Sequence, residues 1–497
     1  MLMQLLTNVF AAAAGASLVL SYAPFGYWFV QFPALMILLM MIVQSRSAKQ
    51  AAWIGWSWGF GLFVTGVFWL RISISQFGGM TESLAIGATL LFVAFIALYI
   101  ALFAWLLRRF IHVTSPLSWM LLVPSLWFLL ELARGWVLTG FPWLSLGYAH
   151  SDSPLSSLMP VMGVHGVSWV VMFLMACLFA AKRWYAWLSL IGMLLLISFI
   201  PKEWTQPTGV ETSVAVVQGN VPQRLKWRAN LFDQWLAHYE SLSATAPEAQ
   251  VVIWPETAIS GFEQELSPEL ERLDALFKQK DQSFVTGIVA GDRQGAYYNA
   301  MITRGDEAEG EYYKHHLVPF GEFMPLKQLI GPVMSWLRIP VSDFSIGAAE
   351  QSLLELKAQR VGVNICYEDA FAREVLKALP DADWLLNASN DAWFGDSLAP
   401  HQHLQIARAR AVEAGRYLIR ATNTGISAVI DQRGKLVATI PQFEADVMQA
   451  KVPSYQGVTP YVVLRDWPLM LMSLLALGWV WLQLRWHSRD PLGTVRF

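Results

Sequence analysis

The chain has 497 residues, of which 55% are apolar and only 14% charged, and its formal net charge is -2. This balance lacks the basic footprint of a nucleic-acid-binding protein, so no nucleic-acid partner is expected. An apolar fraction this high is typical of membrane proteins, and the length allows about two to four domains.

The acidic residues divide the chain into an apolar and a polar part. Only Glu82, Glu131 and Asp152 occur before residue 201, and the other 34 of 37 follow. We therefore expect a polytopic α-helical membrane domain at 1–202 and a soluble domain at 203–464. A last membrane helix with a cytoplasmic tail is expected at 465–497.

Eight segments are predicted to cross a bilayer, since a spanning helix needs about 20 mostly apolar residues. They are 5–23, 28–44, 51–70, 84–107, 116–133, 155–180, 184–200 and 467–485. The first lacks the basic stretch that begins a cleaved signal peptide, so we interpret it as a retained anchor.

Lysine and arginine in the short loops predict the orientation, because cytoplasmic loops are enriched in positive charge. One side carries nine such residues and the other carries four near the membrane. The nine are Arg46, Lys49, Arg108, Arg109, Lys182, Arg183, Arg485, Arg489 and Arg496; the four are Arg71, Arg134, Lys202 and Arg465. Both termini are therefore expected in the cytoplasm, with segment 203–464 on the opposite side.

Segment 203–464 alternates short β-rich runs with helical ones. Strands are predicted at 212–221, 249–256, 283–291, 297–304, 360–368, 381–389 and 425–431, and a helix at 400–416. Strands buried on both faces, with helices between them, indicate a layered α/β domain.

Three residues with complementary chemistry stand at or beyond predicted strands. Glu256 ends "VVIWPE", Cys366 ends "VGVNIC", and Lys314 precedes a loop that also contains Glu322. A carboxylate can take the proton of a thiol and return it later, and an ammonium can stabilise an oxyanion. Together these groups could perform covalent acyl transfer through a thioester.

Each of these residues also has a purely structural interpretation. A lone cysteine such as Cys366 more often packs in a core than reacts. Glu256 could be a charge at a helix N-terminus, and Lys314 could be solvated. Spacing alone does not bring the three together. The other cysteine, Cys177, lies in an apolar run and is expected to pack against lipid or helices.

No metal or other cofactor is expected. His315 and His316 are adjacent, which is a poor spacing for joint metal binding, and no other ligand cluster supports zinc.

Six stretches resemble known families. "WPETA", "YYKHHLVPFGEFMP" and "NICYEDAF" resemble the Glu-Lys-Cys signature of the nitrilase superfamily, whose fold is a four-layer α-β-β-α sandwich. "QGNVPQRLKW", "TGFPWLSLGYAHSDSP" and "GRYLIRATNTGISAVID" resemble the membrane-embedded apolipoprotein N-acyltransferase family. The resemblance covers essentially the whole chain, and it includes the apolar segments on both sides of the soluble domain.

The resemblance implies an acyltransferase with two lipid substrates. Cys366 would attack the sn-1 ester of phosphatidylethanolamine in the membrane and form an acyl thioester. The α-amine of the S-diacylglyceryl cysteine of an apolipoprotein would then accept the acyl chain, in a ping-pong scheme. Glu256 would be the base, Lys314 the oxyanion stabiliser and Glu322 a supporting carboxylate.

The resemblance also implies roles around these groups. Tyr367 and Glu368 would shape the pocket behind the nucleophile, and Trp227 would hold lipid from a mobile loop near the entrance. The protein would be a monomer in the inner membrane of a bacterium, with its catalytic domain in the periplasm.

Three rival functions stay open at the level of sequence. A membrane-tethered nitrilase-type amidase or hydrolase would use the same residues with water as acceptor. A scaffold protein could retain the fold without catalysis. A transporter is disfavoured, because charges within the predicted spans are scarce.

Overall fold

The computed structural model describes residues 2–111, 115–201, 203–291, 295–328, 331 and 343–489. The chain forms two compact units. The helical unit comprises Met1–Phe68, Ile86–Lys202 and Val463–Phe497, and the sheet unit comprises Trp69–Ala85 and Glu203–Val462.

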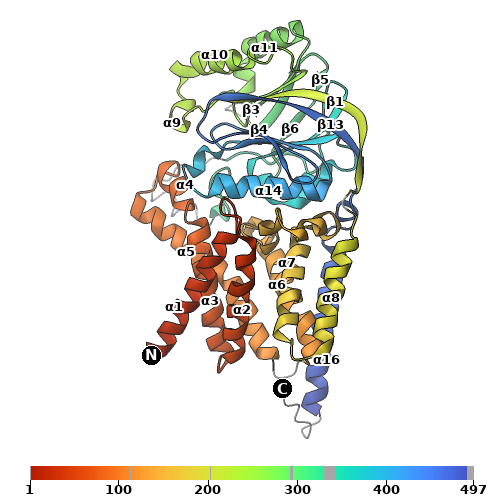
Figure 1. Cartoon of the computed structure of the whole chain (residues 1–497). Coiled ribbons are helices and arrows are strands. Elements are labelled where there is room, and N and C mark those ends of the chain that lie inside the picture. The colour runs from red at the N-terminus through yellow and green to blue at the C-terminus, as the bar shows by residue number, and fades with distance from the viewer. Residues whose placement is uncertain are drawn as a thin grey trace. The chain divides into compact units, whose positions relative to one another are not determined.

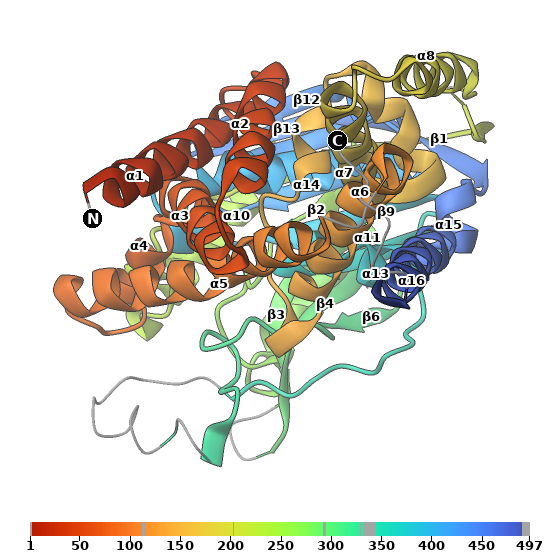
Figure 2. The ribbon, with the colours of Figure 1, turned by 90° about the horizontal axis from the view of Figure 1, so that it is seen from below.

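Helices lie at all eight positions where membrane spans are predicted. They are α1 (Leu2–Ser17), α2 (Gln31–Gln44), α3 (Ala48–Val67), α5 (Glu82–Phe110), α6 (Pro116–Arg134), α7 (Met159–Phe179), α8 (Trp184–Phe199) and α16 (Trp467–Arg489). Figure 2 shows α3 beside α1 and α16 beside α6, and both pairs are in contact.

The structure confirms several apolar helices that could span a membrane, whereas the count of eight stays a prediction. Within the described residues, four segments are long and apolar enough: Leu2–Ser21, Glu82–Phe110, Pro116–Arg134 and Pro154–Phe179. A fifth would join α3 to α4 (Leu70–Gln76), which are bent by 55°. The shorter apolar helices are Trp28–Gln44, Trp184–Phe199 and Trp467–Gln483.

Small residues let α1 and α3 approach closely. A Cβ added to Gly61 would lie 2.0 Å from the Ala12 carbonyl oxygen, and one added to Gly15 would lie 1.9 Å from that of Trp58. Such contacts are typical of packed membrane helices, where backbone approach replaces a hydrophobic driving force.

The sheet unit contains two mixed sheets. In sheet order, the first consists of β13 (Asp446–Gly457), β1 (Thr205–Gln218), β2 (Val251–Ile253), β3 (Ser283–Gly291), β4 (Tyr297–Gly305) and β6 (Glu311–Tyr313). The second consists of β12 (Leu436–Ile440), β11 (Ser427–Ile430), β10 (Leu418–Thr422), β9 (Trp384–Ser389), β8 (Gln359–Ile365), β7 (Leu354–Leu356) and β5 (Ala308–Glu309). The central neighbours β1-β2-β3 and β8-β9-β10 are parallel.

Helices cover the outer face of each sheet, which confirms the predicted α-β-β-α sandwich. Figure 1 shows α10 (Phe232–Ser243) and α11 (Ser267–Gln279) on one side of the sheets and α14 (Ala399–Ala414) on the other. Alternate side chains of a strand point to opposite faces. In β1, Val214 and Val216 accordingly pack between the sheets, and Ala215 and Val217 pack toward α10 and α11.

Residues 69–85 differ from the predicted boundaries, because they fold with the sheet unit and not with the first domain. The Trp69 ring packs edge-on against Phe394 at 4.8 Å, and its Nε1 donates to Gln402 Oε1 at 3.2 Å. Ser73 donates to the Trp393 carbonyl at 2.6 Å. The buried Trp69 ring and these hydrogen bonds attach the segment to η10 (Asp391–Phe394) and α14 of the sheet unit.

Candidate active site

The candidate nucleophile begins a sharp turn at the end of β8. Cys366 starts η8 (Cys366–Ala370) with φ +52°, a conformation that costs non-glycine residues energy and is often found at functional sites. Its carbonyl accepts hydrogen bonds from Asn387 Nδ2 at 3.2 Å and His403 Nε2 at 3.3 Å. These bonds fix the turn, and the side chain is buried, at 8% exposure.

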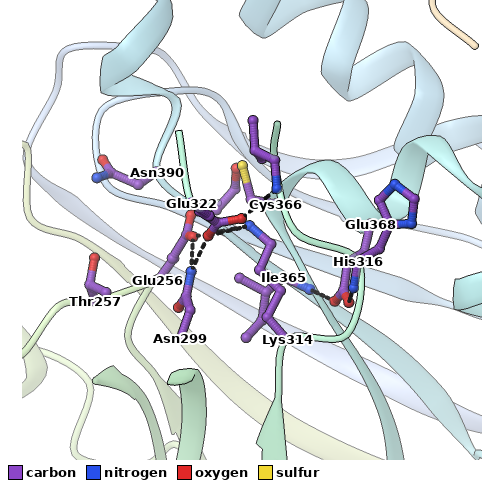
Figure 3. A network of polar contacts seen from close by, with 12 residues as sticks. Glu256, Thr257, Asn299, Lys314, His316, Glu322, Ile365, Cys366, Glu368 and Asn390 are labelled. Carbon is purple, nitrogen blue, oxygen red and sulfur yellow. Dashed lines mark hydrogen bonds and ion pairs between the residues drawn. The ribbon is translucent and has the colours of Figure 1, made fainter. Parts of the chain in front are cut away.

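Glu256, Lys314 and Glu322 form one cluster, in which Glu256 and Lys314 are buried and Glu322 is partly buried. Lys314 Nζ lies 2.9 Å from Glu322 Oε1 and 3.7 Å from Glu256 Oε1. Asn299 Nδ2 donates to the same two oxygens, at 2.7 Å for Glu256 and 2.9 Å for Glu322. The cluster is thus a cation held between two carboxylates, with an amide that bridges them (Figure 3).

The Cys366 thiol belongs to the same electrostatic environment. Burial raises the pKa of the thiol above its ordinary value, Glu256 raises it further, and Lys314 opposes both. The resting side chain is therefore a neutral thiol at neutral pH and needs a base to become a nucleophile. Figure 3 shows the sulfur on the side of the Glu256 and Glu322 carboxylates.

Lys314 keeps its charge in spite of burial. Burial by itself would lower its pKa, but the carboxylates of Glu322 and Glu256 outweigh this effect and raise the pKa above its ordinary value. A fixed ammonium in a site shielded from water is suited to stabilise negative charge that develops on a substrate oxygen.

Glu368 links the nucleophile turn to the segment after Lys314. Its carboxylate accepts from the backbone N–H groups of Ile365 at 2.7 Å, His315 at 2.8 Å and His316 at 2.9 Å. The Tyr312 hydroxyl donates to it as well, at 3.0 Å. Burial raises the pKa of Glu368 to about 7. Glu368 therefore lies behind the candidate nucleophile and connects its turn to the loop that contains His315 and His316.

The two predicted aromatic residues occupy different positions. The Tyr367 ring packs edge-on against Phe371 at 5.1 Å and is tilted toward His316 at 6.0 Å. Trp227 directly follows the short helix α9 (Gln223–Lys226), and its side chain is half-exposed. An exposed indole next to a buried site is available to contact an apolar substrate.

A buried network of charged side chains contacts the turn that begins at Cys366. His403 contacts Asp391 at 3.0 Å and Asp369 at 2.9 Å, and Arg420 contacts the same carboxylates at 2.8 Å and 3.2 Å. Burial and Arg420 would lower the pKa of His403, but the two carboxylates raise it to about 9. Two cations thus balance two anions.

Sequence reasoning missed Asn299, Lys226 and this network. Asn299 interrupts the buried strand "YYNAMITR", and Arg420 interrupts "LIRAT". A polar side chain inside a buried strand must find a partner, so these interruptions were the available signal. In the part of the chain that the structure describes, no three His, Cys, Asp or Glu side chains gather as metal ligands.

Comparison with known proteins decides the family. Residues 14–178 match the family described as "Apolipoprotein N-acyltransferase N-terminal domain", and residues 213–461 match "Carbon-nitrogen hydrolase". The chain is 39% identical over 483 residues to an apolipoprotein N-acyltransferase of Photobacterium profundum. The alignment covers 94% of this chain and 93% of the relative. This chain belongs to the apolipoprotein N-acyltransferase family. It is accordingly a membrane-associated acyltransferase with a carbon-nitrogen hydrolase domain.

A second relative agrees. The apolipoprotein N-acyltransferase of Vibrio cholerae is 39% identical over 500 residues and covers 98% of each chain. Among solved structures, Nit3 of Saccharomyces cerevisiae, a member of branch 10 of the nitrilase superfamily, matches 58% of this chain and 97% of its own. Its identity is 19% and its TM-score 0.37.

Proposed function

We propose that this chain transfers an acyl chain from a membrane phospholipid to an apolipoprotein through a thioester on Cys366. The donor ester is sn-1 of phosphatidylethanolamine, and the acceptor is the α-amine of the S-diacylglyceryl cysteine. The observation that carries this function is a buried neutral thiol beside the Glu256–Lys314 pair, whose ammonium lies 3.7 Å from the carboxylate. Membership of the family supplies the substrate class.

In the first half-reaction, the Cys366 sulfur attacks the ester carbonyl carbon as Glu256 takes the thiol proton. Lys314 stabilises the tetrahedral oxyanion that forms. When the intermediate collapses, the carbon–oxygen bond to the glycerol breaks, and Glu256 returns the proton to the departing lysophospholipid. The acyl group is then bound to the enzyme as a thioester.

In the second half-reaction, the lipoprotein amine attacks the thioester carbonyl. Glu256 takes a proton from the attacking nitrogen, and Lys314 again stabilises the oxyanion. Collapse breaks the carbon–sulfur bond, the sulfur regains the proton, and an amide leaves. One site therefore serves two lipids in turn, which is a ping-pong scheme.

The surrounding residues hold these groups in place. Glu322 pairs with Lys314, so the ammonium does not remain bound to Glu256 alone. Glu368 and Tyr367 form the wall behind the nucleophile, and Trp227 contacts the lipid at the entrance. No metal or cofactor takes part.

The membrane layout suits substrates with long acyl chains. Each methylene moved from lipid into water costs about 0.8 kcal/mol, so the tails should stay in the bilayer during transfer. We infer eight spans in the inner membrane of a bacterium, with both termini cytoplasmic. The catalytic unit then faces the periplasm, and the enzyme works as a monomer.

Intact-protein mass spectrometry after incubation with phosphatidylethanolamine tests the chemistry. We expect one acyl adduct that hydroxylamine removes, and no adduct in Cys366→Ala. Cys177→Ala is the matched control and should acylate normally, since this second free cysteine lies in α7 of the helical unit, whereas the candidate site residues belong to the sheet unit. An adduct that persists in Cys366→Ala would overturn the assignment of the nucleophile. Release of free fatty acid with no transfer to a diacylated peptide would indicate the hydrolase instead.

Cysteine labelling tests the orientation, because both native cysteines are buried. Lys451 and Lys49 are exposed and lie on opposite sides of the membrane in the proposed topology. A membrane-impermeant maleimide should label Lys451→Cys in spheroplasts, and Lys49→Cys only after lysis. The reverse pattern would show that the catalytic unit is cytoplasmic.

A further inference from the structure

The short helix α9 is held between two strand ends of the site. At its start, Asn390 Nδ2, which follows β9, donates to Gln223 Oε1 at 2.8 Å. At its end, Lys226 Nζ donates to the Glu256 carbonyl at 3.2 Å and to Thr257 Oγ1 at 2.9 Å. Trp227 is the next residue along the chain. The contacts of Lys226 therefore hold the backbone of Trp227 near the Glu256 turn.

Lys226 is an unusual lysine. Its side chain is only 2% exposed, although long charged side chains are rarely buried without an ionic partner. Among the described residues, both hydrogen-bond acceptors of its ammonium belong to the turn formed by Glu256 and Thr257. Burial lowers the pKa of Lys226 to about 8, and the charge of Glu256 opposes this effect.

The turn that Lys226 contacts is strained. Thr257 has φ +46°, which is uncommon for a β-branched residue. Such a conformation persists only where neighbouring groups enforce it. A cation that binds the carbonyl before Thr257 and its hydroxyl can enforce it from one side.

We propose that Lys226 is a positioning residue for the catalytic base: its ammonium fixes the Glu256 turn and couples the docking of α9 and Trp227 to that turn. This role deepens the proposed function, since it rests on Glu256 as the base. It also predicts that a lipid held by Trp227 and a correctly oriented Glu256 occur together.

The two cations near Glu256 contact different parts of this residue. The groups that face Glu256 are Lys314, Glu322 through Asn299, the Cys366 thiol and Lys226. Lys314 lies 3.7 Å from the carboxylate of Glu256, whereas Lys226 donates to its backbone carbonyl. Without Lys226, the carboxylate keeps its contact with Lys314, but the backbone of the turn loses its hydrogen bond from an ammonium.

The single-turnover rate of thioester formation on Cys366 tests this role. The rate is followed by intact-protein mass spectrometry with vesicles that contain phosphatidylethanolamine, across a range of pH. Lys226→Met should slow acylation about 10- to 100-fold, the size of effect expected when charge-assisted hydrogen bonds are lost. Its alkaline limb should also disappear, because in the wild type the rate should fall as the pH rises through about 8, where Lys226 loses its charge. Lys226→Arg keeps the charge and should recover most of the wild-type rate.

Arg224→Met is the matched control, since Arg224 lies on the same helix and is exposed. Its rate and pH profile should equal those of the wild type. Thr257→Val removes one acceptor with little change in shape, and it should slow acylation in the same direction by a smaller factor. This second variant keeps the test decisive if Lys226→Met does not fold.

Two results would overturn the role of Lys226 alone. One is a Lys226→Met or Thr257→Val variant that acylates at the wild-type rate. The other is a slow Lys226→Met variant with the same alkaline limb as the wild type, which would indicate a merely structural lysine. If the wild type itself forms no thioester on Cys366, the proposed function fails, and the role of Lys226 fails with it.

Discussion

Burial keeps the Cys366 thiol protonated until a substrate arrives. A free thiolate reacts with oxidants, so a thiol whose pKa lies above its ordinary value is protected in the resting enzyme. This protection has a cost, because a base must act in each turnover. In the proposed mechanism this base is the Glu256 carboxylate, which accepts a hydrogen bond from Asn299 at 2.7 Å.

Glu368 should make stability depend on pH. Burial raises its pKa to about 7 in the folded protein, whereas an unfolded glutamate has a pKa of about 4.3. Its contribution to stability is therefore fully present below about pH 4.3 and is lost as the pH rises through 7. We expect the unfolding temperature of the wild type, relative to Glu368→Gln, to fall across this window. Thermal unfolding in detergent from pH 4 to 8 measures it, and a difference that does not vary with pH would contradict it.

At the scale of elements, the site depends on strand ends that meet. Glu256 follows β2 and Lys314 follows β6, both in the first sheet, whereas Cys366 follows β8 in the second. The two sheets pack face to face, and this packing brings the three residues together. The Glu256 turn lies against β3, where only a glycine leaves enough space.

Gly287→Ala should therefore damage the site from a distance. A Cβ at this position in β3 would lie 2.2 Å from the Thr257 amide nitrogen and 2.6 Å from the Pro255 carbonyl oxygen. Both contacts are with backbone, so the Glu256 turn must shift. We expect at least a tenfold loss in the rate of Cys366 acylation, since a displacement of about 1 Å can cost 100-fold. Gly87→Ala in α5, where the added Cβ meets nothing within 4 Å, is the control and should keep the rate.

The strands and the helix that the sequence predicts are those with a strong pattern of apolar residues. The apolar runs at β1, β2, β3, β4, β8, β9 and β11 predict these strands, and the α14 helix is predicted from its own sequence. β10 was missed because Arg420 lies in its middle, and this charge is tolerated only because Asp391 and Asp369 neutralise it. β13 was missed because it is an edge strand that contains Pro453, and such strands need little apolar patterning.

The catalytic roles of the site residues stay predictions from the sequence, whereas the geometry of the candidate site needed the fold. The chemistry of Glu256, Lys314 and Cys366 can be derived from their side chains, and the resemblance added Glu322 and Glu368. The position of Glu368 behind the nucleophile required the fold, since its partners are backbone groups of Ile365 and two histidines. Likewise, nothing in the spacing of Lys226 and Glu256 shows that one contacts the other.

At the scale of the whole molecule, the chain passes between the two units four times. Residues 69–85 enter the sheet unit and leave it again before the main segment 203–462 begins. The sheet unit is therefore built from two separate pieces of chain. A fragment limited to 203–462 would lack the side chains that cover Phe394.

Trp69→Ala should destabilise the sheet unit through this contact. The indole is 7% exposed, and truncation of a buried tryptophan costs about 3 to 5 kcal/mol. We expect a lower unfolding temperature in detergent and easier proteolysis after residue 203. Leu84→Ala in the same segment is the control, because Leu84 is half-exposed and its loss should change little. Equal unfolding temperatures for wild type and Trp69→Ala would show that the segment is not part of the unit's core.

The docking of Trp69 also sets an order of events during synthesis. Its hydrogen-bond partner Gln402 is 333 residues further along the chain, and the Ser73–Trp393 pair is separated by 320. At about 5 to 20 residues per second, Trp69 leaves the ribosome roughly 15 to 70 s before Gln402. During that interval Trp393, Phe394 and Gln402, which the segment contacts in the folded protein, have not yet been synthesised. The sheet unit can thus be completed only after most of the chain has been translated. Until then, residues 69–85 expose apolar surface to which chaperones can bind.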